Sequence, residues 1–475
     1  MKYIYKIIIV LFIITNISSC TKKDELNNDL EIQNFVWKGL NAFYLWQDDI
    51  DDLQDNRFTN QKQLDKFISN KTPEDLFESL LYERGTTDKW SWIVDDYIAL
   101  EQLFAGVRKS NGMKFGLVEF DTNSPEIFGY VRYVIPNSEA ENLGIQRGDI
   151  IYGINGQQLT KSNYSSLISS DSYTVNFGNI SQLGSTINVI PNDINIVLNK
   201  EIINENPIHT VTTYEIDGHK IGYIFYNQFV ANYDEQLNDA FLQLKTENIT
   251  DLVLDLRYNG GGSVQTAVNL SSMITGQFNN ELFAKEKWNS KWQSYLEAEH
   301  PEYLINNFTN TLNNGESINN LNLNEITVIV TGSSASASEL VINGLIPYIN
   351  VNLVGTTTHG KYVGSVTLYD SDSYTRDDST LNQDHHYAMQ PIVLEMVNKL
   401  GENEKNGFTP ENYLAENFAD LGQLGNPNEP LFEMAINKIL GLRNSSNNNL
   451  IELKTISNSD LNNPYYLNMY VELNK

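Results

Sequence analysis

The stretch ITVIVTGSSASASELVINGLI, residues 326–346, decides how the C-terminal half of this 475-residue chain should fold. It opens with a β-branched apolar run, which predicts a buried strand over 326–330. A turn of small residues follows, and the apolar pattern after it predicts a helix over 336–346. Ser336 is therefore expected at a helix N-terminus, where backbone N–H groups lack partners and the helix dipole is positive.

Similar strand and helix patterns surround this stretch. Strands are predicted at 221–229, 252–256, 351–354 and 389–396, and helices at 233–246, 264–274 and 431–440. Alternation of this kind indicates a parallel sheet with crossover helices. The interruption at 278–324 is interpreted as a lid or a wall of the active site, and 370–386 as a polar loop.

A second stretch, VGTTTHGK at 354–361, supplies a candidate base for Ser336. A serine is a poor nucleophile until a base takes its proton, and a desolvated lysine can be that base. Lys361 would need its pKa lowered by several units from its usual ~10.4, and burial can do this. His359 is a rival base. Ser333, Ser334 and Ser338 are rival nucleophiles, although each could instead cap the helix.

Three motifs together resemble the carboxyl-terminal processing peptidases, also called tail-specific serine proteases. SASE at 336–339 is similar to the run that carries the family's nucleophile. Lys361 follows a glycine and lies 25 residues after Ser336 (361 − 336), as the family's base does. DLRYNGGG at 255–262 resembles the family's glycine loop. The resemblance covers roughly residues 112–440 and is strongest across 221–366.

The resemblance implies a role for several residues. Ser336 would be the nucleophile and Lys361 the base. The oxyanion would be held by the N–H of Ala337 and by that of Gly261 or Gly262. Glu339 would support the site. The family often carries a glutamine four residues after the lysine, but Ser365 stands there, so the third catalytic residue is unassigned.

No metal or organic cofactor is implied. The glycine loop could also be considered a phosphate cradle, but no Gly-Lys-Ser/Thr follows it and no basic residue lies nearby past Arg257. A net charge of −28 argues against a nucleic-acid partner and against binding to membranes through a polybasic patch.

Residues 131–156 resemble a PDZ domain, with a short helix, a Gly-Asp turn and an Asn-Gly hairpin. Phe115, Gly116 and Leu117 would then form a loop whose backbone N–H groups capture a peptide C-terminus while the peptide adds as a strand. The alternative is a small β-domain that serves only for packing.

The N-terminus has the pattern of a bacterial export signal. Lys2 and Lys6 precede an apolar run at 7–14 that is too short to span a membrane, and the small residues before Cys20 resemble a lipoprotein box. Cys20 is the single cysteine, so the mature chain has no internal disulfide, and lipidation of Cys20 is expected. A free cysteine in an ordinary secretory signal is the alternative.

The sequence thus predicts a multidomain α+β protein. The expected parts are a lipoprotein signal at 1–20, a polar tether at 21–29, a helical N-terminal domain at 30–110, a PDZ-like β-rich domain at 111–205, an α/β peptidase core at 206–442 and a tail at 443–475 to which no role is assigned. The expected protein is a lipid-anchored serine endopeptidase of the cell envelope, acting on unfolded or non-globular proteins with a free C-terminus. A non-catalytic binding or scaffold protein of the same fold is the alternative.

Overall fold

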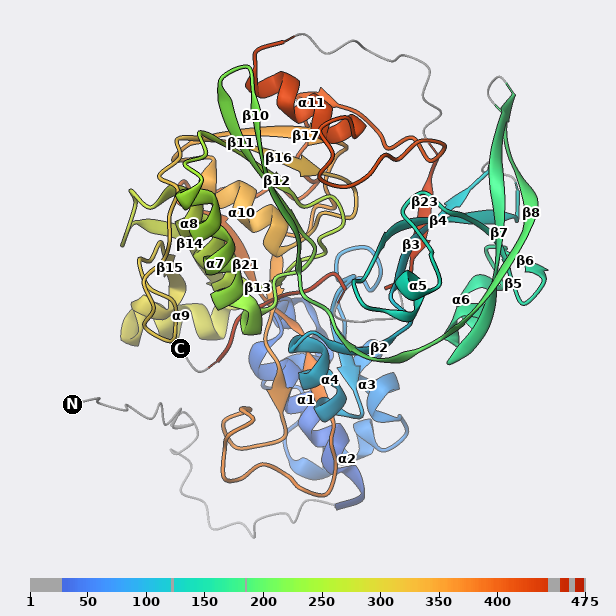
Figure 1. Ribbon diagram of the computed structural model, residues 1–475. Helices are drawn as coiled ribbons and strands as arrows, with labels where there is room; N and C mark the ends of the chain where they lie inside the picture. Colours follow the sequence, from blue (N-terminus) through green and yellow to red (C-terminus); the bar gives the residue numbers. More distant parts are fainter. Residues whose placement is uncertain (1–27, 121–123, 184–185, 443–452, 461–465, 474–475) are drawn as a thin grey trace.

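The computed structural model describes residues 28–120, 124–183, 186–442, 453–460 and 466–473 (Figure 1). The predicted signal and tether, including Cys20, lie outside these residues except for the last two positions of the tether. None of the helices in the described ranges is long and apolar enough to cross a membrane.

The N-terminal part is mainly helical, as the sequence predicts. Thr72 caps its third helix by accepting a hydrogen bond from the N–H of Asp75 at 3.1 Å, and Pro73 occupies the first turn, where it needs no N–H partner. A small three-stranded sheet joins this part to the core, because β1 (Trp92–Val94) pairs with β20 (Ala388–Gln390), which also pairs with β19 (Leu368–Tyr369). The helices are α1 (Glu31–Phe43), α2 (Gln61–Ile68), α3 (Pro73–Ser79) and α4 (Tyr97–Phe104).

The PDZ-like part is a curled antiparallel sheet with the strand order β3-β4-β5-β7-β8, from which the long hairpin β7–β8 projects (Figure 1). Its own apolar core contains Phe115, Leu117 and Val131. The strands are β3 (Met113–Glu119), β4 (Ile127–Val134), β5 (Ile150–Ile154), β6 (Gln157–Gln158), β7 (Ser172–Leu183) and β8 (Thr186–Asn199), with short helices α5 (Glu139–Asn142) and α6 (Tyr164–Ser169).

The structure corrects one prediction in this part. Phe115, Gly116 and Leu117 do not form a loop, because they lie in the middle of the buried strand β3. The alternating apolar residues of this segment favour a strand, and the other edge of β3 is already paired with β23 (Thr455–Asn458) of the C-terminal tail.

The core contains a six-stranded sheet with the order β10-β11-β12-β16-β17-β22, parallel except for the pair β10–β11. Successive side chains point to opposite faces. Ile224, Leu254 and Val328 therefore pack with α7, α8 and α10, whereas Phe225, Val253 and Ile329 pack with α11. The strands are β10 (Ile208–Ile216), β11 (His219–Tyr226), β12 (Asp251–Asp255), β16 (Glu325–Val330), β17 (Asn350–Gly355) and β22 (Asn412–Tyr413). The helices are α7 (Asp234–Thr246), α8 (Val264–Thr275), α10 (Ala337–Leu345) and α11 (Pro430–Ile439).

A second six-stranded sheet has the order β13-β24-β18-β21-β14-β15. Two strands of the 278–324 segment, β14 and β15, belong to it, and β14 pairs antiparallel with β21. The interpretation of this segment as a lid is wrong for these two strands, and the alternative of a wall of the active site stays a prediction. The strands are β13 (Gly262–Ser263), β24 (Met469–Tyr470), β18 (Val363–Ser365), β21 (Ile392–Asn398), β14 (Leu282–Trp288) and β15 (Ile305–Asn307), and α9 (Ser290–Glu299) follows β14. β2 (Val107–Ser110) and β9 (Glu201–Asn204) form a separate pair.

Candidate active site

Ser336 lies at the turn between β16 and α10, where it is the N-cap residue. Its φ of 65° is in the left-handed region that a residue with a side chain rarely adopts. Such a conformation costs about 1–3 kcal/mol and persists only where surrounding contacts enforce it. The side chain is fully buried, and its hydroxyl has no hydrogen-bond partner among the described residues.

Two neighbouring serines differ from Ser336. The hydroxyl of Ser334 donates to the carbonyl of Leu256 at 2.8 Å and accepts the N–H of Thr331 at 2.9 Å. The hydroxyl of Ser338 donates to the carbonyl of Asn259 at 3.0 Å. Both therefore tie the turn to the glycine loop, and Ser336 is left as the buried serine whose hydroxyl is uncommitted.

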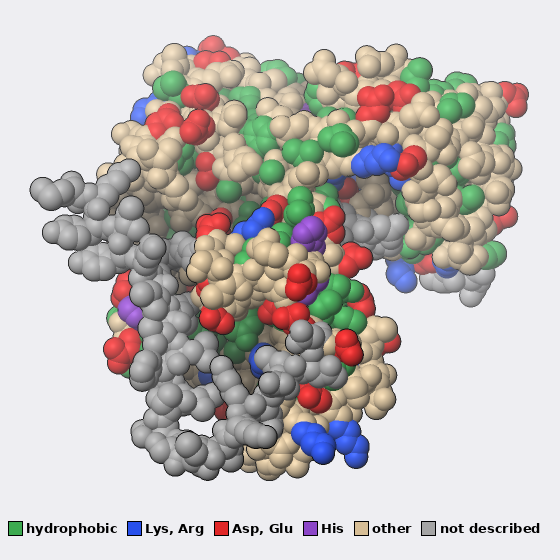
Figure 2. Space-filling view, turned by 90° about the horizontal axis from the view of Figure 1, so that it is seen from below, with side chains coloured by type: hydrophobic (Ala, Val, Ile, Leu, Met, Phe, Trp, Pro, Cys, Tyr) green, Lys and Arg blue, Asp and Glu red, His purple; other side chains and the backbone are tan. Residues whose placement is uncertain are grey.

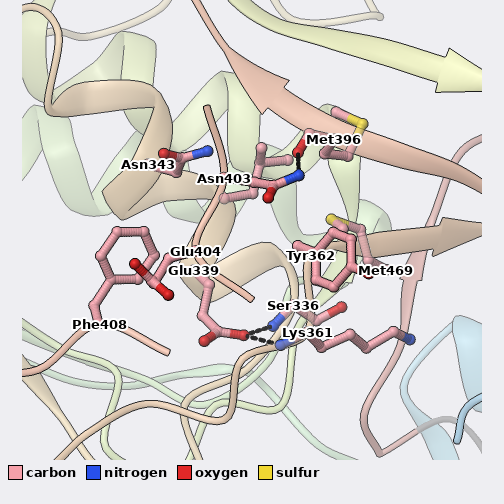
Figure 3. Close-up of a pocket in the computed structure, with 11 residues that line it drawn as sticks. Ser336, Glu339, Asn343, Lys361, Tyr362, Met396, Asn403, Glu404, Phe408 and Met469 are labelled. Carbon is pink, nitrogen blue, oxygen red and sulfur yellow. Dashed lines mark hydrogen bonds between the residues drawn. The ribbon is translucent and has the colours of Figure 1, made fainter. Parts of the chain in front are cut away.

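Glu339 connects the two predicted catalytic residues. One of its carboxylate oxygens accepts the backbone N–H groups of Ser336 and Lys361, each at 2.8 Å (Figure 3). The other accepts the N–H of Gly360 and the hydroxyl of Thr358, each at 2.6 Å. Burial raises the pKa of Glu339, and these four donors oppose that effect. The carboxylate therefore holds the backbones of both loops in a fixed relation.

Lys361 is buried, as a lysine base requires. Burial lowers its pKa to about 7, against the opposing charges of Asp88 and Glu339. Its Nζ lies 5.7 Å from the centre of the Trp90 ring. The rival base His359 presents its ring to the same tryptophan at 6.3 Å. Trp90 thus lies over the amine, and no motif in the sequence singles it out.

The nucleophile and the base are not in contact. Nζ of Lys361 donates a hydrogen bond to the carbonyl of Leu467 at 2.6 Å, and Figure 3 shows the lysine side chain extended away from Glu339. Leu467 belongs to the C-terminal tail, so a segment without a predicted role occupies the base.

The glycine loop lies directly against the nucleophile. A β-carbon built on Gly261 would be 2.6 Å from Cβ of Ser336, 3.0 Å from the nitrogen of Ala337 and 2.4 Å from the carbonyl oxygen of Asn468. Only glycine fits there, which agrees with its φ of 111°. The N–H of Gly261 donates to the side chain of Asn259 at 2.9 Å, so of the two predicted glycine donors Gly262 is the better candidate.

Arg257 forms buried ion pairs within the protein. It is fully buried and bonds to the carboxylates of Asp255 and Glu429, with a shortest contact of 2.6 Å to Glu429. Glu429 is also the N-cap of α11. This pairing leaves the guanidinium no role in binding a phosphate.

Ser365 does not orient Lys361 among the described contacts. Its hydroxyl contacts Oε1 of Gln390 at 2.8 Å and Oδ1 of Asn468 at 3.0 Å. Nδ2 of Asn468 donates to the same oxygen of Gln390 at 2.9 Å. Ser365, which stands where the family often has the orienting glutamine, is therefore engaged by the tail, and the third catalytic residue stays unassigned. Sequence reasoning missed Gln390, which lies in a separate strand.

The C-terminal tail packs against the end of the glycine loop and against β18. Met469 pairs with Gly262 of β13, and Tyr470 pairs with Ser365 of β18, both in parallel registers. Met469 also lines the pocket beside Ser336 (Figure 3). The rest of the pocket is formed by Glu339, Leu340, Asn343, Lys361, Tyr362, Met396, Asn403, Glu404 and Phe408. Within the described residues, no group of three His, Cys, Asp or Glu side chains could hold a metal ion.

Comparison with known proteins identifies the family of this chain. The model of peptidase family S41 matches residues 220–386, that of the S41 N-terminal domain matches 31–92, and that of the PDZ domain matches 130–176. The chain carries a peptidase family S41 domain together with the N-terminal domain of that family. The order of the three matches reproduces the three folded parts described above.

Individual S41 relatives agree with this assignment. The chain is 22% identical over 421 residues to a probable CtpA-like serine protease of Staphylococcus aureus, covering 84% of this chain and 74% of that protein. It is 26% identical over 230 residues to the carboxy-terminal processing protease CtpA of Bacillus subtilis, covering 48% and 43%. A putative S41 protease of Bacteroides fragilis has a similar structure, with a TM-score of 0.66 and 25% identity over 86% of this chain and 98% of that one. These relatives support a serine protease.

Proposed function

We propose that this protein is a serine endopeptidase of the cell envelope that recognises protein C-termini and cleaves through an acyl-enzyme formed by Ser336 and Lys361. The observation that carries the proposal is the state of Ser336. Its hydroxyl is buried without a hydrogen-bond partner among the described residues, on a strained residue at a helix N-terminus. One carboxylate, that of Glu339, fixes its backbone to that of a desolvated lysine.

The chemistry follows from these positions. Neutral Lys361 takes the proton of the Ser336 hydroxyl as its oxygen attacks the substrate carbonyl, and later returns that proton to the leaving amine. The N–H of Ala337, in the first turn of α10, has no acceptor within its own helix and can bind the oxyanion. Gly262 supplies the second donor. For this arrangement, the Lys361 side chain must leave Leu467 and turn to Ser336.

The PDZ-like part supplies the recognition step. A peptide would add as a strand to the edge of β3, a mode in which main-chain hydrogen bonds provide affinity. The substrates are unfolded or non-globular proteins, because their ends can adopt an extended strand. A lipid on Cys20 would hold the enzyme at the membrane.

A cleavage assay with an unfolded protein tests this function. Wild type should produce fragments, and Ser336→Ala should produce none while retaining its thermal unfolding transition. The alternative of a non-catalytic binding protein is favoured by the lack of contact between Ser336 and Lys361. It would be supported if both proteins bind the substrate and neither cleaves it.

A further inference from the structure

The chain's own tail occupies the edge of the PDZ-like sheet. β23 pairs antiparallel with β3, so that Ser457 lies opposite Leu117 and Asn458 opposite Gly116. The ladder continues with the N–H of Ser459, which donates to the carbonyl of Phe115 at 2.9 Å. The tail therefore has the position and direction that a bound peptide strand would take.

The tail strand ends in a cationic site at the start of β3. One carboxylate oxygen of Asp460 lies 2.7 Å from Nη1 of Arg108 and 2.7 Å from Nζ of Lys114. Burial would raise the pKa of Asp460, but the charges of Lys114 and Arg108 hold it at about 2. Asp460 is thus a carboxylate bound where a peptide ending on this strand would place its own C-terminal carboxylate.

The charges around this site require an anion. Glu205 is the other acid, paired with both Arg108 and Lys114. Arg132 is buried nearby and influences the pKa of both Lys114 and Asp460, yet it forms no ion pair among the described residues. Without Asp460, two guanidinium groups, of Arg108 and Arg132, and the amine of Lys114, whose pKa burial lowers to about 7, would face one carboxylate. Because unpaired buried charges are costly, the site should bind another carboxylate when Asp460 leaves.

The same tail reaches the catalytic groove. Five residues separate Asp460 from Tyr466, which limits the distance between the two described segments to about 20 Å. From Tyr466 onward the tail lies on the glycine loop, accepts the hydrogen bond of Lys361 and engages Ser365. The β3 edge and the groove are therefore filled by two stretches of the same C-terminal tail, residues 453–460 and 466–473.

We propose that Arg108 and Lys114 bind the C-terminal carboxylate of a substrate, and that Asp460 fills this site until a substrate displaces it and loosens the tail from Lys361. This inference rests on the proposed function, since it names the site by which a C-terminus is recognised. It replaces the predicted backbone loop at Phe115, Gly116 and Leu117 with two cationic side chains. The tail acts as an intramolecular competitor, present at a high effective concentration.

A binding experiment on the Ser336→Ala protein tests the exchange without turnover. The probe is the fluorescent peptide LKTISNSG, which copies residues 453–459 and ends in glycine, with either a free carboxylate or an amide at its C-terminus. Adding Asp460→Asn should tighten binding of both peptides about tenfold or more, because it weakens the tail that competes with them, and the acid peptide should bind more tightly than the amide peptide. The matched control Asp193→Asn changes an exposed acid within strand β8 and should have no effect.

Further variants keep the test decisive. Arg108→Gln combined with Asp460→Asn should abolish the preference for the acid peptide. If Asp460→Asn does not fold, hydrogen exchange on the Ser336→Ala protein serves instead, because saturating acid peptide should deprotect residues 455–459 and 466–471. Equal binding of acid and amide peptides, or unchanged protection at saturation, would overturn the proposal. In that case, cleavage that depends on Ser336 would still support the proposed function, and only this recognition site would be excluded.

Discussion

Nζ of Lys361 donates a hydrogen bond to the carbonyl oxygen of Leu467 at 2.6 Å, so the predicted base is held by the chain's own tail. The hydroxyl of Ser336 meanwhile has no hydrogen-bond partner in the part of the chain that the structure describes. Different features suit the two groups to catalysis. Burial lowers the pKa of Lys361, and a strained turn holds Ser336. Catalysis requires that Lys361 exchange Leu467 for Ser336, and the predictions below follow from that requirement.

The first prediction concerns the pH dependence of activity. Because burial lowers the pKa of Lys361 to about 7, kcat/KM should rise as pH increases through about 7 and level off above it. Wild-type rates on one unfolded substrate from pH 5 to pH 10 measure this, over the range that a lowered lysine pKa should cross. A rate independent of pH across that range would exclude Lys361 as the base. Lys361 would also be excluded if Lys361→Met remained active and His359→Ala lost activity.

The stability of the protein should depend on the same lysine. The folded-state pKa is depressed, so between about 7 and the ordinary lysine pKa of 10.5 the unfolded chain binds a proton that the folded chain does not. Lys361 therefore makes the free energy of unfolding rise with pH over that window. Urea denaturation of wild type and Lys361→Met should show a steeper rise for wild type, and parallel curves would contradict the burial of a neutral lysine.

Serine substitutions should affect stability in opposite ways. Ser336→Ala removes a buried hydroxyl without a partner and should leave the melting temperature unchanged or higher. Ser334→Ala leaves the carbonyl of Leu256 and the N–H of Thr331 unpaired, at a cost of about 1–3 kcal/mol. Calorimetry of the two variants measures this difference. A larger loss in Ser336→Ala than in Ser334→Ala would mean that the Ser336 hydroxyl is bonded in solution.

Glu339→Gln should reduce activity strongly, because an amide can accept hydrogen bonds at only one of the two oxygens that now accept four donors. We expect kcat to fall by roughly a hundredfold or more, since misplacing a reacting group by about 1 Å costs that much. Glu404→Gln, in the same pocket, is the matched control and should be nearly neutral. Comparable losses in both variants would show that Glu339 has no special role in positioning.

Cys20→Ser should release the protein from membranes, because the lipid on Cys20 is the only proposed anchor. Fractionation followed by washing with high salt measures this. A variant that stays with the membrane after the wash would show that the lipoprotein interpretation is mistaken.

Local patterns allowed much of the fold to be predicted. The strand before Ser336 and the helix after it have strong apolar patterns, so the predicted positions differ from β16 and α10 by one residue. Contacts between distant segments carry no such signal. β23 and β24 contain four and two residues, too few for a pattern, and they form because β3 and β13 offer unpaired edges.

The candidate site was likewise predictable only in part, because some of its residues lie in local motifs and others come from distant segments. Ser336, Lys361 and Glu339 were predicted because short motifs carry them. Trp90, Gln390 and Asn468 reach the site from three other elements, and their sequence surroundings resemble ordinary core or loop. The partners of Ser365 could not be predicted, because its bonds depend on where the tail packs.

Labelling with a fluorophosphonate, which reacts with activated serines, tests the central claim most directly. Peptide mapping by mass spectrometry should find one adduct in wild type, on the peptide that contains Ser336, and Lys361→Met should react far more slowly although Ser336 is still present. An adduct on another serine, or equal labelling rates in wild type and Lys361→Met, would contradict the account.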